Sequence, residues 1–330
     1  DDPYRWLEDD RSEKTKSWVQ AENKVTEDYL AQIPFREAIR SRLSALWNYE
    51  KLSAPFTEGA YTYYYKNNGL QNQYVLYRKD KDGTEEVFLD PNLFSADGTT
   101  SLAGITFSKD GSLVAYQLSE GGSDWSKVIV MDAVTKKVIG DTLVDVKFSG
   151  LAWKGNEGLY YSSYDKPIVG SELSEKTDQH KLFYHVLNTA QATDKLIFGG
   201  ADFPRRYVGA NVTDDGRFLV VSAANATSGN ELYVKDLKDA NSTFTTIVGN
   251  MEKNHYILDN NDDQLIIYTE LDAPNGKLVT ADFKNPDPAT WKDLIAETEN
   301  VLSPSTAGDK IFASYLKDAT SHVLQSPCLA

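Results

Sequence analysis

One phrase recurs along this chain: a polar turn rich in Asp, Asn or Gly, followed at once by a short strand of aromatic and β-branched residues. The copies lie about 46 to 58 residues apart. Their turns are Glu58-Gly59, Lys109-Asp110-Gly111, Asn156-Glu157-Gly158, Asp214-Asp215-Gly216, Asp262-Asp263 and Gly308-Asp309. Periods of roughly 40 to 50 residues with several strands each are typical of β-propeller blades, which stack because a single sheet cannot bury both of its faces. We therefore predict an all-β propeller.

The repeats predict about five and a half blades over residues 51–325. The sixth copy runs out at Val323-Leu324-Gln325, and an incomplete circle leaves blade faces and edges exposed. The last five residues, 326–330, do not continue the strand pattern. We interpret them as an unrelated or frameshifted tail, and a natural end at Ala330 is the alternative.

Residues 1–50 have a different period and are predicted to be helical. Ser12 is placed to cap a first helix, and Pro34 suits the first turn of a second one. Apolar residues recur at helical spacing at Trp18, Val19, Val25, Tyr29, Leu30, Ile39, Leu43, Leu46 and Trp47. Both helices are amphipathic, so each needs a surface to cover.

The net charge of −15 argues against nucleic acid and anionic membranes as partners. Its simplest interpretation is solubility, and a modest attraction for cationic peptides is the alternative. The single cysteine, Cys328, makes no intrachain disulfide, so packing must hold the fold. No apolar run approaches the roughly 18 residues of a membrane helix. The chain opens at Asp1 without a Met, and we expect that a presequence was removed or left out. The compartment, cytoplasmic or periplasmic, stays open.

Catalytic motifs are not found in the sequence. A serine hydrolase of the α/β type needs Gly-x-Ser-x-Gly, and the nearest segment, residues 121–125, lacks the second Gly and is expected to be an inter-strand loop. His180 and His185 should lie on opposite faces of a strand, so we expect no metal pair. The Asp214-Asp215 and Asp262-Asp263 pairs are interpreted as turn residues. We therefore predict no catalytic residue, metal site or cofactor within this chain.

Six phrases, in order along the chain, resemble the prolyl oligopeptidase family of serine peptidases. They are residues 2–9 (DPYRWLED), 69–77 (GLQNQYVLY), 88–92 (FLDPN), 122–125 (GSDW), 146–149 (VKFS) and 181–185 (KLFYH). The likeness is looser beyond residue 185 but continues to about residue 325.

The resemblance implies a seven-bladed propeller capping an α/β-hydrolase domain, with the helical N-terminus packed on the hydrolase. That domain follows the propeller in the family, so it is expected to be absent from this chain. The implied parent enzyme cleaves short peptides after proline. The implied partners are therefore proline-containing peptides and the missing hydrolase domain.

The resemblance also implies three substrate-binding residues on the propeller. Phe148 matches the aromatic residue of a pocket for the residue two before the cleaved proline, and its alternative role is an ordinary blade-core Phe. Tyr207 and Thr227 align with two further wall positions, where the family often has Met and Cys. An exposed ring in a water-poor cleft would gain affinity by burying peptide side chains.

Two functions follow from these observations. The first is a non-catalytic gating and filtering portion of a prolyl oligopeptidase-like enzyme, inactive as this chain alone. The second is a non-enzymatic propeller scaffold for proteins or peptides. Without a hydrolase domain, we expect the helices to pack elsewhere, self-associate or fray.

Overall fold

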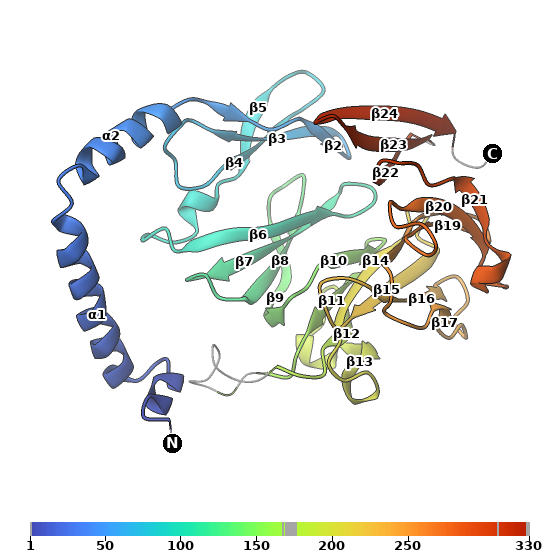
Figure 1. Ribbon diagram of the computed structural model, residues 1–330, viewed down its shortest axis with the longest axis horizontal. Coiled ribbons are helices and arrows are strands. Elements are labelled where there is room, and N and C mark those ends of the chain that lie inside the picture. The colour runs from blue at the N-terminus through green and yellow to red at the C-terminus, as the bar shows by residue number, and fades with distance from the viewer. Residues whose placement is uncertain (1, 167, 169–176, 309, 328–330) are drawn as a thin grey trace. The chain divides into compact units, whose positions relative to one another are not determined.

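The computed structural model describes residues 2–166, 168, 177–308 and 310–327 (Figure 1). It divides into two compact units, of which the first comprises Asp1–Phe148, Ser163–Thr177 and Leu187–Ala192, and the second comprises the remainder. The first unit holds the helices and the first two sheets, and the second unit holds four further sheets.

The N-terminal segment is helical, as predicted. A 3₁₀ turn, η1 (Arg5–Glu8), precedes α1 (Glu13–Ala31) and α2 (Arg36–Trp47). The Ser12 hydroxyl accepts a hydrogen bond from the Thr15 N–H (3.1 Å), which is the predicted N-cap. Pro34 lies in the turn before α2 and not in its first turn, because the helix begins at Arg36.

The described residues then form six antiparallel sheets. Five are meanders of consecutive strands, and in the first sheet β1 and β2 both pair with β3. The first three sheets are β1 (Lys51–Leu52), β2 (Phe56–Glu58), β3 (Tyr61–Asn67), β4 (Val75–Lys79) and β5 (Glu85–Leu89); β6 (Thr100–Phe107), β7 (Leu113–Glu120), β8 (Trp125–Asp132) and β9 (Val138–Lys147); and β10 (Leu151–Lys154), β11 (Gly158–Ser163), β12 (Lys181–Val186) and β13 (Lys195–Gly199). The last three are β14 (Tyr207–Val212), β15 (Phe218–Ala224), β16 (Glu231–Asp236) and β17 (Thr245–Val248); β18 (His255–Asn261), β19 (Gln264–Thr269), β20 (Lys277–Asp282) and β21 (Lys292–Ile295); and β22 (Leu302–Ala307), β23 (Lys310–Lys317) and β24 (Thr320–Pro327).

The all-β propeller is therefore confirmed, but its blade count is six and not five and a half. The sixth blade has three strands among the described residues. Strand β24 includes Ser326 and Pro327, which pair with Ile311 and Lys310, so the strand pattern runs two residues further than expected. Cys328 and the rest of the expected tail, and Asp309 of the sixth turn, lie outside the described residues.

The recurring turn has the same hydrogen bonds in different blades. Asp110 Oδ1 accepts from the Ser108 hydroxyl (2.8 Å), and Asp215 Oδ1 accepts from the Thr213 hydroxyl (2.9 Å). Each carboxylate oxygen also accepts the backbone N–H two residues later (2.9 Å in both turns). The turn role predicted for Asp214-Asp215 is therefore confirmed at Asp215, whose side chain fixes the local backbone.

The core consists of clusters shared by consecutive sheets, as blade stacking requires. Tyr63 and Leu76 of the first sheet pack with Val114 of the second. Corresponding clusters join the third to the fourth sheet, the fourth to the fifth and the fifth to the sixth. Each sheet therefore buries a face only by contacting its neighbour.

A buried guanidinium joins the first sheet to the second. The Arg78 side chain is almost fully buried and forms an ion pair with Glu86 (2.6 Å). It also donates hydrogen bonds to the carbonyl oxygens of Ala133 and Val134 in the β8–β9 turn. Because the Arg78 guanidinium also lies over the Tyr61 ring (4.2 Å to the centroid), its charge is compensated on several sides.

The outermost strand pair of a blade is irregular in five of the six sheets. The register with the last strand shifts after Leu76, Ser126, Leu182, Leu232 and Leu278. The pairing of β23 with β24, in contrast, runs over eight residue pairs without a shift.

The apolar side chains of the two helices are exposed. They include Val25, Tyr29, Ile39, Leu43 and Trp47, each at least half exposed. None of the described helices combines the length and the apolar composition needed to cross a membrane. Both helices are formed along their length, and their self-association stays a prediction.

Candidate functional site

Phe148 follows the last residue of β9 and has an unusual backbone. Its φ is +53°, in the left-handed region that bulky side chains rarely adopt. The ring is 46% exposed and meets the Tyr164 ring edge-on, with 6.3 Å between centroids. Phe148 is therefore a surface residue, and the alternative role of a blade-core Phe is wrong.

The Phe148 ring is held in place by the residue before it. The Lys147 ammonium lies 5.2 Å from the centroid of the Phe148 ring and 4.9 Å from that of Trp125. The Lys147 side chain is buried, and Lys147 pairs with Trp125 across the β8–β9 ladder. Two cation–π contacts from a partly desolvated ammonium would each be worth about 1 kcal/mol, which helps to fix an exposed ring.

The segment Gly121 to Asp124 forms the loop between β7 and β8, as predicted. Both glycines have positive φ, and the Ser123 hydroxyl accepts a hydrogen bond from the Trp125 N–H (3.1 Å). This is an inter-strand turn and not the strand-to-helix turn of a hydrolase nucleophile. The loop lies at the same end of its sheet as Phe148, because Trp125 pairs with Lys147.

Tyr207 and Thr227 lie at one end of the fourth blade. Tyr207 begins β14 opposite Ala224, the last residue of β15, and Thr227 lies three residues further on in the β15–β16 loop. Tyr207 is 53% exposed, and Thr227 is also exposed. Phe148 lies at the equivalent end of the second blade. At this end β9 finishes and the loop between β7 and β8 turns.

The two neighbouring histidines have separate buried partners. His180 Nδ1 accepts the backbone N–H of Val208 (2.9 Å), next to Tyr207. His185 Nδ1 lies 2.8 Å from Asp194 Oδ1, and the Tyr161 hydroxyl donates to Asp194 Oδ2 (2.8 Å). The sequence reasoning missed Asp194, which no motif connects to His185. Within the described part of the chain, no group of three or more His, Cys, Asp or Glu residues is placed to hold a metal ion.

The acidic turn of the fifth blade forms ion pairs with the fourth. Arg217 contacts Asp236 (3.0 Å) and Asp263 (2.5 Å). Hydrogen bonds from Lys284 and Arg217 hold the pKa of Asp263 below its ordinary value. Asp263 thus joins two blades electrostatically in addition to its predicted place in a turn.

Sequence comparison relates this chain to one protein family. Residues 1–328 match the family described as prolyl oligopeptidase, N-terminal beta-propeller domain. The chain is 59% identical over 324 residues to the prolyl endopeptidase of Elizabethkingia meningoseptica, an alignment that covers 98% of this chain and 46% of that protein. It is 31% identical over 330 residues to prolyl oligopeptidase A of Amanita bisporigera, covering 90% of this chain and 43% of that protein.

Solved structures of prolyl oligopeptidases have a similar fold over this part of their chains. Prolyl oligopeptidase B from Galerina marginata, bound to a 35mer hydrolysis and macrocyclization substrate, superposes with a TM-score of 0.86 at 26% identity. That superposition covers 99% of this chain and 49% of the other. The chain spans about half the length of the relatives it matches.

Proposed function

The chain belongs to the prolyl oligopeptidase family as its N-terminal β-propeller, and from this membership we propose that it is the gating and filtering portion of a serine endopeptidase that cleaves short peptides after proline. The observation that carries the proposal is the continuous match over residues 1–328. The six-bladed meander supports it independently of sequence identity.

The bond-breaking step is assigned to a partner α/β-hydrolase domain. The 330 residues contain no Gly-x-Ser-x-Gly, which such a domain needs for its nucleophile. In the proposed reaction the hydrolase serine attacks the carbonyl carbon of the proline residue, the peptide C–N bond breaks and the protonated amine leaves, and water then hydrolyses the acyl-serine ester to release the acid. The propeller contributes access control and part of the binding surface.

The six blades would be part of a seven-bladed ring. The sixth sheet has three strands among the described residues, whereas the preceding sheets have at least four. A fourth strand paired with β24, followed by one more blade, would complete the ring.

Phe148, Tyr207 and Thr227 are the proposed substrate contacts of the propeller. Their support is that all three are exposed and lie at equivalent ends of their blades. An exposed aromatic ring gains affinity by covering an apolar peptide side chain. The exposed apolar side chains of α1 and α2 would pack on the hydrolase domain.

A chimaera tests this function. Residues 1–327 would be fused to the portion of the Elizabethkingia meningoseptica prolyl endopeptidase that follows the matched region. We expect the chimaera to cleave a Gly-Pro chromogenic peptide and to react with an active-site serine probe, whereas the 330-residue chain alone does neither. A folded chimaera without turnover would favour the non-enzymatic scaffold, and turnover by the chain alone, with its mass confirmed, would refute the gating role.

The same chimaera tests the filter. A short proline-containing peptide should be cleaved much faster than a long unfolded polypeptide with the same cleavage sequence. Equal rates for the two substrates would contradict size selection by the propeller.

A further inference from the structure

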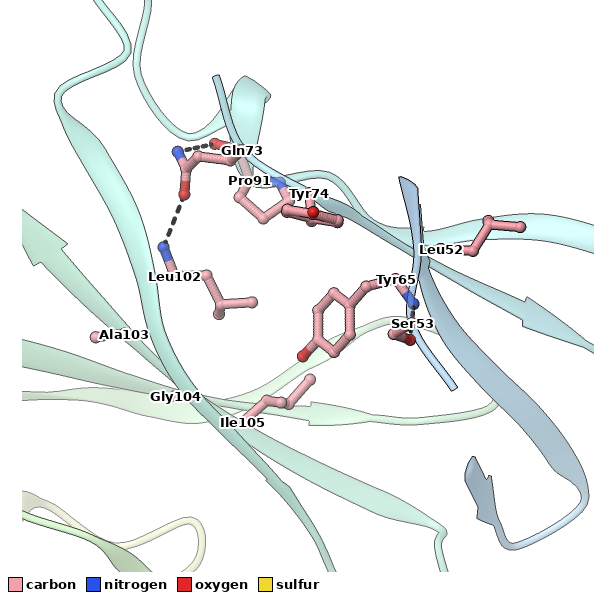
Figure 2. A pocket seen from close by; sticks show the side chains of 10 residues that line it. All are labelled: Leu52, Ser53, Tyr65, Gln73, Tyr74, Pro91, Leu102, Ala103, Gly104 and Ile105. Atoms are coloured by element: carbon pink, nitrogen blue, oxygen red, sulfur yellow. Dashed lines mark hydrogen bonds between the residues drawn. The ribbon is translucent and has the colours of Figure 1, made fainter. Parts of the chain in front are cut away.

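A hollow lies in the first compact unit, and Phe148 is not among its lining residues. It is a pocket of about 660 Å³ between the first sheet and the start of β6 (Figure 2). Its apolar wall consists of Leu52, Tyr65, Tyr74, Pro91, Leu102 and Ile105. Figure 2 shows the Tyr65 ring projecting between Leu102 and Ile105. A volume of this order is typical of ligand pockets.

None of the residues that line this pocket carries a charge. The amide of Gln73 is fully engaged with the backbone: it donates to the carbonyl oxygens of Pro91 (3.2 Å) and Thr100 (2.8 Å) and accepts from the Leu102 N–H (3.1 Å). The Ser53 hydroxyl accepts the Tyr65 N–H (2.9 Å). These side chains fix the wall and leave little polar capacity for a charged ligand, which would lose its hydration on entry.

Two further features of the wall bear on a ligand: a tyrosine hydroxyl and an irregularity of a strand. Among the residues that the structure describes, the Tyr65 hydroxyl makes no hydrogen bond, and a phenolic O–H can donate one. The second feature is a β-bulge: the register of β6 on β7 shifts between Leu102 and Gly104. The bulged residue, Ala103, is exposed and has no partner on β7, and bulges of this kind are common beside binding sites.

We propose that this pocket binds an uncharged, proline-containing segment of a peptide, with the Tyr65 hydroxyl donating to one of its carbonyl oxygens. Proline segments suit such a wall because aromatic-lined grooves bind the preformed polyproline conformation. A prolyl amide has no N–H to satisfy, and its carbonyl oxygen is free to accept a hydrogen bond. The inference rests on the proposed function only in taking a peptide as the ligand.

Calorimetric titration of the 330-residue chain tests the proposal. The probe is acetyl-Pro-Pro-Tyr-Pro-Pro-amide, and the matched peptide is acetyl-Ser-Gly-Tyr-Gly-Ser-amide. We expect saturable binding of the proline peptide, weakened about fivefold by Tyr65→Phe through loss of one hydrogen bond. Ala103→Trp fills the mouth of the pocket and should weaken binding by at least about tenfold.

Tyr256→Phe is the control, because Tyr256 is a strand tyrosine in β18 of another blade and does not line this pocket. It should leave the affinity unchanged. Equal binding of the two peptides, no binding of the proline peptide, or full affinity in a folded Tyr65→Phe chain would each overturn the proposal. If Ala103→Trp fails to fold, the Tyr65→Phe and Tyr256→Phe pair still decides the question.

The titration can contradict this inference without contradicting the proposed function, and the chimaera experiment can fail without affecting this inference. Turnover of a short chromogenic peptide by the chimaera does not require this pocket. A chimaera that cleaves while the chain binds no proline peptide would overturn this inference alone, and an inactive chimaera would leave the titration result standing.

Discussion

The backbone at Phe148 illustrates how much a single residue can be constrained by its surroundings. A left-handed φ at a bulky residue costs roughly 1–3 kcal/mol and persists only where neighbours over-determine it. Here the neighbours are the Lys147 ammonium and the Tyr164 ring. Such strain is common at ligand-binding positions.

Phe148→Ala is expected to weaken substrate binding without unfolding the propeller. In the active chimaera, KM for a Gly-Pro peptide should rise about tenfold with kcat little changed, because the ring supplies uniform binding. The control is Leu93→Ala, since Leu93 is an exposed apolar residue elsewhere in the first unit. A fall in kcat at constant KM would argue against a binding role.

His255 gives the stability of the chain a specific pH dependence. Burial lowers the pKa of His255 below the ordinary value of 6.5, and its Nδ1 lies 2.9 Å from the Thr269 hydroxyl. A lowered pKa means that the unfolded state binds the proton first as the pH falls. The contribution of neutral His255 is therefore fully present above the unfolded pKa and is lost as the pH falls toward the folded one.

Urea unfolding between about pH 7.5 and pH 5.5 measures this contribution. The free energy of unfolding should fall toward pH 5.5, and His255→Gln should flatten the slope. His322→Gln is the control, because His322 is exposed on β24. A slope that is the same in His255→Gln as in the parent chain would refute the assignment.

At the scale of the elements, two copies of the recurring turn touch each other. Gly111 has a φ of +68°, and a Cβ atom there would lie 2.2 Å from the backbone nitrogen of Gly59 in the first copy. Gly216 occupies the same position of the fourth copy, with a φ of +72°, and a Cβ atom there would meet nothing within 4 Å. The two glycines thus share a conformation but differ in their surroundings.

Alanine substitutions at these two glycines should distinguish the free-energy cost of a left-handed backbone from the cost of a steric clash with the neighbouring turn. Gly216→Ala should cost about 1 kcal/mol of unfolding free energy for its left-handed backbone alone. Gly111→Ala should cost at least about 2 kcal/mol more, because backbone atoms cannot move aside as a flexible side chain does. Denaturant unfolding measures both, and equal costs would contradict the contact between the two turns.

The sequence predicted the elements well where one face is buried. The recurring turn predicted five complete blades, because each copy of the turn precedes a strand whose apolar residues enter a core. It underestimated the sixth blade because β24 is exposed along most of its length and has no apolar alternation to detect. The bulge at Ala103 was not predictable either, because a bulge is defined by counting residues against the partner strand.

The candidate site was predictable only in part. The residue types at Phe148, Tyr207 and Thr227 came from a family resemblance, and the exposure of Phe148 came from the structure. The Asp194 partner of His185 had no signal, since a 3₁₀ turn (η3, Gln191–Thr193) brings it back to the strand. Contacts made by short irregular segments depend on packing that local patterns do not encode.

At the scale of the whole molecule, the N-terminal helices carry a series of exposed apolar side chains. Tyr29 and Leu43 are more than half exposed, although residues of these types are usually covered. An apolar surface of this kind favours association with another chain or domain.

The 330-residue chain is therefore expected to self-associate in solution. The double substitution Tyr29→Lys with Leu43→Lys should shift it toward monomer by sedimentation analysis, since charge opposes burial of the helical face. Gln20→Lys with Ser41→Lys adds the same charge at exposed polar positions of the same helices. Should both pairs have the same effect, charge alone and not the apolar face would be responsible.

The irregular outer strands have a consequence for how this protein behaves at high concentration. A flat, regular sheet edge is a template on which a foreign strand can grow into an aggregate, and a shifted register bends that edge away. Five blades carry such a shift, whereas β24 pairs regularly with β23 and exposes Val323 and Leu324. The outer strands of these five blades should therefore not template fibrillar growth at high protein concentration.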